Sequence, residues 1–136
     1  MIRFSYEKRE SESLGTVMRP MADILVKKRN EDKWYRISMI IDSGADVTLL
    51  PSMYASLLGI ELGNCKSYDM RGVGGTTNIY LSNLDVELDD IRMNMKVGFI
   101  AGNIPPLMGR ADFFRAFEIC FKRDEILFVE SDKNEG

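Results

Sequence analysis

The residues of this chain that could carry out chemistry are concentrated around one aspartate, Asp42. Three apolar residues, 39–41, run directly into it, and Ser43 and Gly44 follow. Glycine takes a positive φ without steric cost, so we expect Gly44 to permit a sharp turn immediately after a buried strand. Asp42 is then a carboxylate held at the end of a rigid element, which is a favourable place for a catalytic acid or base.

The residue types that are missing restrict the possible chemistry. The chain has no histidine, which excludes Ser-His-Asp and Cys-His catalysis and the usual zinc sites. Cys65 and Cys120 have no CxxC spacing, and we expect both to be reduced thiols. We expect no metal ion and no cofactor. A hydrolase built from these residues must work with carboxylates.

Length and charge indicate one globular domain with few classes of partner. The 136 residues, 45% of them hydrophobic and 29% charged, suit a single domain over 1–136, with its core at about residues 20–130. A net charge of -3 argues against a nucleic-acid partner, which would need a basic face. Neither a membrane-spanning apolar run nor a secretory leader is recognisable, so we expect a cytoplasmic protein without a membrane partner.

Short apolar or alternating runs, separated by turn signals, predict an all-β fold organised as a closed barrel. We expect residues 7–13 to form a solvated loop, residues 27–33 a hairpin loop, and residues 131–136 a frayed tail. Brief helices are predicted at 51–59 and 110–116. The predicted strands are 2–6, 21–26, Trp34–Ile41, 47–50, 68–71, 79–81, 84–88, Ile91–Ile100, Phe117–Phe121 and 126–129.

A second notable segment is rich in glycine. Arg71, Gly72, Val73, Gly74 and Gly75 lie between two strand-like runs, which predicts a flexible hairpin tip. Its backbone groups could approach an extended peptide closely. No Lys-Ser/Thr pair follows, so it is a weak candidate for a phosphate-binding loop. An ordinary hairpin loop is the alternative.

With these features, the run Asp42-Ser43-Gly44-Ala45 resembles the D-[ST]-G-A active-site signature of the retropepsin-like aspartic proteases. The resemblance covers about residues 20–130. It implies that Asp42 is catalytic, that its neighbours up to Asp46 shape the active-site loop, and that residues 71–75 form the flap over the substrate.

The same resemblance extends to Leu107-Met108-Gly109-Arg110, which is followed by a predicted short helix. In this family two apolar residues before Gly-Arg pack behind the catalytic loop. The resemblance therefore implies that Gly109 and Arg110 support the loop and that Arg110 forms an ion pair with Asp46. An unrelated junction between a loop and a helix is the alternative.

The chain contains a single D-[ST]-G, because Asp112 and Asp124 have different neighbours. Hydrolysis by this route needs two carboxylates around one water, so two chains must meet across a twofold axis, each contributing Asp42. The family implies that Ser43 hydrogen-bonds across that axis. Residues 2–6 and 126–129 are the candidates for the strands of the dimer sheet.

The sequence thus predicts a homodimeric aspartic endopeptidase that hydrolyses peptides bound beneath two flaps. The alternative is a non-catalytic dimerisation or peptide-binding module on the same fold. We expect the larger aromatic residues to be core rather than substrate pocket, with Phe117 and Phe121 together filling the barrel interior. These residues are Trp34, Phe113, Phe114, Phe117 and Phe121.

Overall fold

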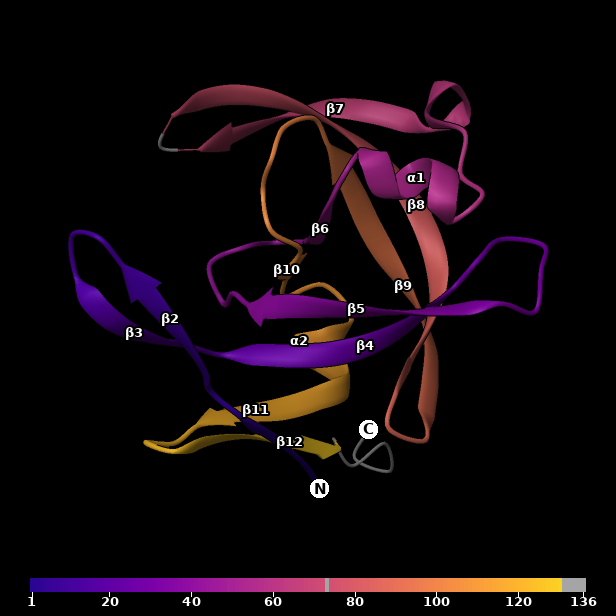
Figure 1. The fold of residues 1–136 in the computed structure, drawn as a ribbon. Helices are drawn as coiled ribbons and strands as arrows, with labels where there is room; N and C mark the ends of the chain where they lie inside the picture. Colours follow the sequence, from indigo (N-terminus) through magenta and orange to yellow (C-terminus); the bar gives the residue numbers. More distant parts are fainter. Residues whose placement is uncertain (73, 131–136) are drawn as a thin grey trace.

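The computed structural model describes residues 1–72 and 74–130, which form three β-sheets with a few short helices (Figure 1). Val73 and the tail 131–136, predicted as part of the flap and as frayed, lie outside the described residues. The prediction of an all-β fold with one or two short α-helices is confirmed. The helices are α1 (Met53–Leu57) and α2 (Phe113–Ala116), with one 3-10 turn, η1 (Leu62–Asn64).

The largest sheet has seven strands in the order β4-β5-β10-β6-β9-β8-β7. β4 also pairs with β8, at Leu25–Glu87 and Val26–Val86, so the sheet curls round until two of its strands meet again. Residues 79–81 and 84–88 are one continuous strand rather than the two that were predicted. The strands are β4 (Met21–Lys27), β5 (Trp34–Ile41), β6 (Thr48–Pro51), β7 (Lys66–Gly72), β8 (Gly75–Leu88), β9 (Ile91–Ile100) and β10 (Leu107–Met108).

The chain ends meet in a second sheet of three strands, β1 (Ile2–Ser5), β12 (Glu125–Glu130) and β11 (Phe117–Phe121). β12 is the central strand, with β1 on one side and β11 on the other. Both edges of residues 126–129 are therefore used within the chain. Of the two strands predicted for a dimer sheet, only β1 keeps an unpaired edge among the described residues.

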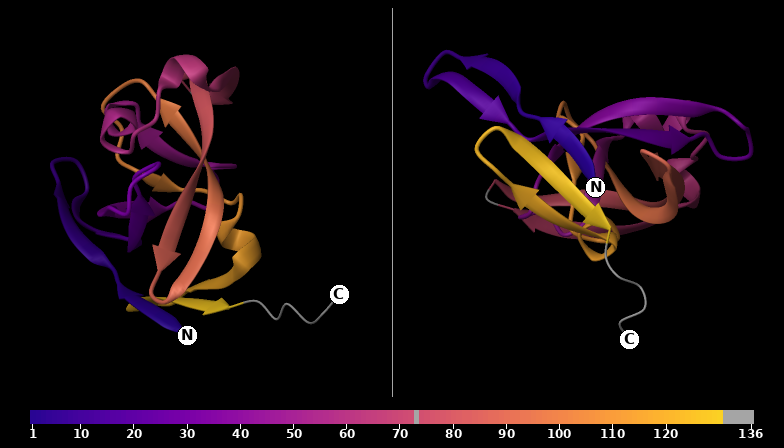
Figure 2. Two further views of the ribbon diagram at one scale, coloured as in Figure 1. Left: turned by 90° about the vertical axis from the view of Figure 1, so that its right-hand side faces the viewer. Right: turned by 90° about the horizontal axis from the view of Figure 1, so that it is seen from below.

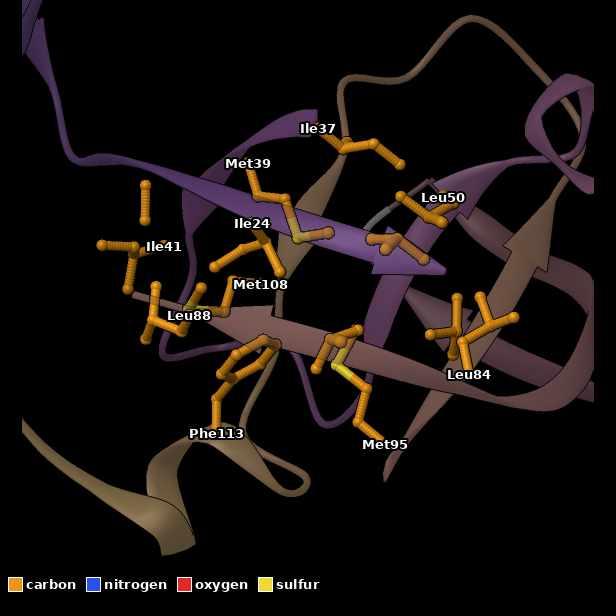
Figure 3. Packing of buried hydrophobic residues seen from close by; sticks show 14 of the residues in the cluster. Ile24, Ile37, Met39, Ile41, Leu50, Leu84, Leu88, Met95, Met108 and Phe113 are labelled. Carbon is orange, nitrogen blue, oxygen red and sulfur yellow. The ribbon is translucent and has the colours of Figure 1, made fainter. Parts of the chain in front are cut away.

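The main core lies inside the curled sheet. Alternate residues of β4 and β5 point into it, as the period of two in a strand requires, and α2 adds Phe113. Figure 3 shows this packing around Met39, Met108 and Phe113, all of which are fully buried. Burying a side chain of this size contributes about 1.5–3 kcal/mol, so the core holds β5 and β10 firmly together.

Two predictions about the ends of the chain are wrong. Residues 7–11 are not loop but strand β2 (Glu7–Ser11), which pairs with β3 (Gly15–Arg19) in a separate two-stranded sheet. Its side chains are polar on both faces, so it has no alternation that a sequence pattern could reveal. Phe117 is buried, but Phe121 is 47% exposed at the end of β11, outside the curled sheet.

None of the helices in residues 1–72 and 74–130 is long and apolar enough to span a bilayer. Cys65 and Cys120 are free, in agreement with the prediction of thiols.

Candidate active site

Asp42 lies directly after β5, where the backbone is held from two sides. Its own N–H donates to the carbonyl of Met108, 2.9 Å away, in β10. On the other side the N–H of Ile41 donates to the carbonyl of Pro20 at 2.8 Å. The strand that leads into Asp42 is thus clamped between β10 and the segment before β4, which gives the aspartate a fixed backbone position.

The carboxylate of Asp42 is oriented by its own loop. The Gly44 N–H donates to Asp42 Oδ1 at 2.9 Å, and the Ala45 N–H donates to the Asp42 carbonyl at 3.2 Å. Asp42 is half-buried, whereas Ser43 and Gly44 are exposed. The loop therefore holds the carboxylate at the surface, in reach of water.

The predicted reason for a glycine at position 44 is wrong, because Gly44 does not have a positive φ. The lack of room for a side chain at this position explains the glycine instead. A Cβ at this position would lie 3.3 Å from Asp42 Oδ1, tighter than an ordinary van der Waals contact. A side chain at position 44 would press on the atom that the loop holds in place.

The segment that begins at Gly109 and Arg110 is hydrogen-bonded to the loop that contains Asp42. β10 is inserted between β5 and β6, the two strands that the loop connects. The N–H of Arg110 donates to the Ala45 carbonyl at 2.8 Å, and that of Ala111 to the Asp46 carbonyl at 2.9 Å. These two bonds fix the second half of the loop through its backbone.

Thr48 is a supporting residue that the sequence reading missed. It is fully buried, and among the described residues it is the only buried polar side chain. Its Oγ1 accepts a hydrogen bond from the Gly109 N–H at 3.1 Å. A lone hydroxyl inside the apolar run 47–50 was the available signal, since buried polar groups almost always have a partner.

The variant Thr48→Val should lower the free energy of unfolding by about 1–3 kcal/mol, because it leaves the buried Gly109 N–H without an acceptor. Amide hydrogen exchange at Gly109 should become faster in this variant. Thr48→Ser is the control, since it keeps the acceptor oxygen and should keep the amide protected. Equal protection of Gly109 in both variants would contradict this role for the hydroxyl.

The predicted ion pair between Asp46 and Arg110 is not formed: in the described part of the chain no salt bridge joins these two exposed residues. The Arg110 guanidinium instead lies over the ring of Phe114, 5.5 Å from its centroid. Phe114 lies only four residues after Arg110, and its ring competes successfully for the cation because an exposed ion pair is worth little in water. Backbone hydrogen bonds, not charges, connect the two segments here.

The glycine-rich segment forms the tip of a hairpin of β7 and β8, with Gly72 paired to Gly75. Gly75 has φ +117°, a conformation that L side chains rarely adopt. Arg71 and Gly74 are exposed, and Figure 1 shows this tip on the same side of the molecule as the connection between β5 and β6.

A small hydrophobic cluster connects that hairpin to the active-site loop. Its buried members come from the segment after the loop (Val47 and, in β6, Leu49), from the hairpin (Ile79) and from β9 (Ile100). Met70 of β7 packs against it. The hairpin is therefore anchored on Val47 and Leu49, which follow the loop that contains Asp42.

Asp112 is not a candidate for the second carboxylate that the predicted mechanism needs. Its Oδ2 accepts a 2.7 Å hydrogen bond from the Lys96 N–H and serves the backbone instead. No group of three or more acidic or thiol side chains in the described residues could hold a metal ion. Hollows of about 410 and 350 Å³ share Lys27, Asp85 and Asn94 as lining residues, and Asp42 lines neither.

Similarity to known proteins was tested at the levels of sequence and structure. No protein-family model and no curated protein sequence matches the chain. A retropepsin-like aspartic protease from Rickettsia conorii superposes with a TM-score of 0.64 at 17% identity, over 93% of this chain and 99% of that chain. EIAV protease, solved with the inhibitor HBY-793, superposes with a TM-score of 0.51 at 18% identity, over 68% and 82% of the two chains.

The chain has the fold of the retropepsin-like aspartic proteases, and the similarity to the Rickettsia conorii protein extends over nearly its whole length.

Proposed function

We propose that this protein is an aspartic endopeptidase, active as a homodimer in which two copies of Asp42 share one catalytic water. The proposal is supported by the Asp-Ser-Gly run that directly follows β5, in a chain that has the fold of the retropepsin-like aspartic proteases. Its backbone is clamped to Met108, its carboxylate is oriented by the Gly44 N–H, and its loop is open to solvent.

In the proposed dimer, the two carboxylates lie about 3 Å apart and hold one proton between them, because like charges at that distance cannot both ionise. The ionised carboxylate takes a proton from the water, and the water oxygen attacks the scissile carbonyl. The protonated carboxyl group donates a hydrogen bond to that carbonyl. Collapse of the resulting diol breaks the C–N bond, and a proton passes to the leaving nitrogen. The titration belongs to the pair rather than to either residue.

The β7–β8 hairpin is the flap of this proposal. Gly72, Gly74 and Gly75 leave backbone N–H and C=O groups accessible to a peptide that lies extended beneath them. Arg71, exposed beside the tip, would contact substrate or the second flap. The substrate is therefore a peptide or protein segment in extended conformation.

Dimer dependence is the direct test. Initial rates of cleavage of a peptide library should rise with the square of the protein concentration below the dimer dissociation constant and linearly above it. Sedimentation velocity over the same range should show the monomer–dimer transition at the concentration where the rate law changes. Cleavage by a strict monomer, or a stable dimer that cleaves no peptide in the library, would contradict the proposal, and the second result would favour a binding module.

A further inference from the structure

The hairpin of β2 and β3, residues 7–19, has no role in the single subunit. Both views of Figure 2 show it standing clear of the two larger sheets. β2 and β3 pair only with each other among the described strands, and neither hydrophobic cluster includes a residue from this segment. A two-stranded hairpin with no third strand and no core is marginally stable in water, so its order requires a further contact.

The position of this hairpin relates it to the active site. Its last residue, Arg19, precedes Pro20, whose carbonyl accepts the hydrogen bond from Ile41, the residue before Asp42. In the proposed dimer the two Asp42 carboxylates are about 3 Å apart, so the base of each hairpin lies close to the twofold axis.

The length and direction of the hairpin carry it beyond that axis. Strands of five residues span about 17 Å. Figure 1 shows the hairpin projecting to the side on which the β5–β6 connection, the flap tip and the β11–β12 turn lie. A hairpin that starts beside the axis and extends in this direction meets the second subunit.

The two strands of the hairpin differ in what they present at their outer edges. β2 carries four charged residues in succession, 7–10, a pattern that discourages pairing with another strand. β3 has no charge before Arg19, and it contains Val17 and the 54% exposed Met18. Leu14, just before β3, is 75% exposed. The uncharged edge of the hairpin is thus the one suited to contact another protein surface.

The charge of the hairpin favours a second copy of the same chain over a strongly charged partner. Three acidic residues (Glu7, Glu10, Glu12) and three basic residues (Lys8, Arg9, Arg19) give residues 7–19 no net charge. A mixed, neutral surface can oppose itself across a twofold axis without like-charge repulsion, as an isologous contact requires. Phe121, 47% exposed at the β11–β12 turn, adds apolar surface on the same side.

We infer that residues 7–19 form a dimerisation arm that reaches across the twofold axis and packs its β3 edge, with Leu14 and Met18, on the partner subunit. The inference rests on the proposed function, because the shared Asp42 site defines the axis. The arm supplies no catalytic group. It lowers the dissociation constant of the dimer and so sets the protein concentration at which the active site assembles.

The test compares two double variants of the full chain by sedimentation velocity. Leu14→Lys/Met18→Lys should raise the dimer dissociation constant at least about tenfold, since it places charges in an apolar contact. Met53→Lys/Leu57→Lys is the matched control, because these residues are 76% and 40% exposed and belong to α1, a helix that lies away from the β2–β3 hairpin (Figure 1). It should leave the dissociation constant unchanged.

A shortened chain gives a second, independent measurement. Glu7 and Arg19 are paired, so an Asn-Gly turn in place of residues 8–18 joins them without disturbing β1 or β4. This variant should also dimerise at least about tenfold more weakly and should regain wild-type specific activity at saturating protein concentration. If the wild type is dimeric and active and both variants have its dissociation constant, the proposed dimerisation arm is wrong, while the protease proposal stands. A monomeric wild type that cleaves nothing would overturn both.

Discussion

Replacement of Asp42 by asparagine is expected to lower kcat/KM for peptide cleavage by roughly 10³-fold or more, because an amide cannot take a proton from the attacking water. The fold should be unaffected, since the asparagine Oδ1 can still accept the hydrogen bond from the Gly44 N–H. The measurement is peptide cleavage with and without a pepstatin-type inhibitor, together with thermal unfolding of both proteins. Asp90→Asn is the control, because Asp90 is exposed in the turn between β8 and β9.

The same variant tests whether two copies of Asp42 act together. When equal amounts of wild type and Asp42→Asn exchange subunits freely, one quarter of the dimers keep both aspartates, and activity per wild-type chain should fall to roughly half. Full activity in the mixture would mean that each chain works alone. Activity that survives in pure Asp42→Asn would end the aspartic-protease proposal.

The second large effect is expected at Gly109, where Gly109→Ala should lower the free energy of unfolding by about 3 kcal/mol. The new Cβ would lie 2.3 Å from the backbone carbon and oxygen of Val47 and 2.7 Å from the Thr48 nitrogen. Backbone atoms cannot rotate away as a side chain can, so β6 and β10 must separate. Thermal unfolding should show a fall in Tm of roughly 10 °C.

A control for Gly109→Ala is available in the same chain. At Gly63 a Cβ would meet nothing within 4 Å and φ is ordinary, so Gly63→Ala should change the stability by less than about 0.5 kcal/mol. If Gly109→Ala were equally harmless, the close approach of β10 to the residues after Asp42 would not be a requirement of this fold. Peptide cleavage should fall along with the stability, because the displaced backbone also supports the active-site loop through Arg110 and Ala45.

Much of the secondary structure was predictable, because most strands bury one face. Trp34–Ile41 and Ile91–Ile100 begin and end where their apolar patterns do. β2 was missed for the converse reason: a strand whose side chains are polar on both faces resembles a loop in sequence. Phe121 was misplaced because alternation identifies a face of a strand but not the sheet against which that face packs.

Some features of the candidate site were likewise predictable from the sequence, and others were not. The apolar run into Asp42, the Ser-Gly that follows and the glycine-rich hairpin are local patterns, and the structure has each in the predicted kind of element. The contacts between distant segments could not be predicted from the sequence. Asp46 and Arg110 were expected to pair by charge, yet their segments are joined by backbone hydrogen bonds, and the guanidinium lies over Phe114.

The sequence by itself determined that this is a β protein with one carboxylate placed after a buried strand, since burial and turn formation depend on residues close together in the chain. Only the tertiary structure decided that β10 lies between β5 and β6, that Thr48 holds Gly109, and that the hairpin of residues 7–19 stands clear of the two larger sheets. These features depend on the order and register of strands that are far apart in sequence. No local pattern encodes them, because the same alternation is satisfied by many different neighbours.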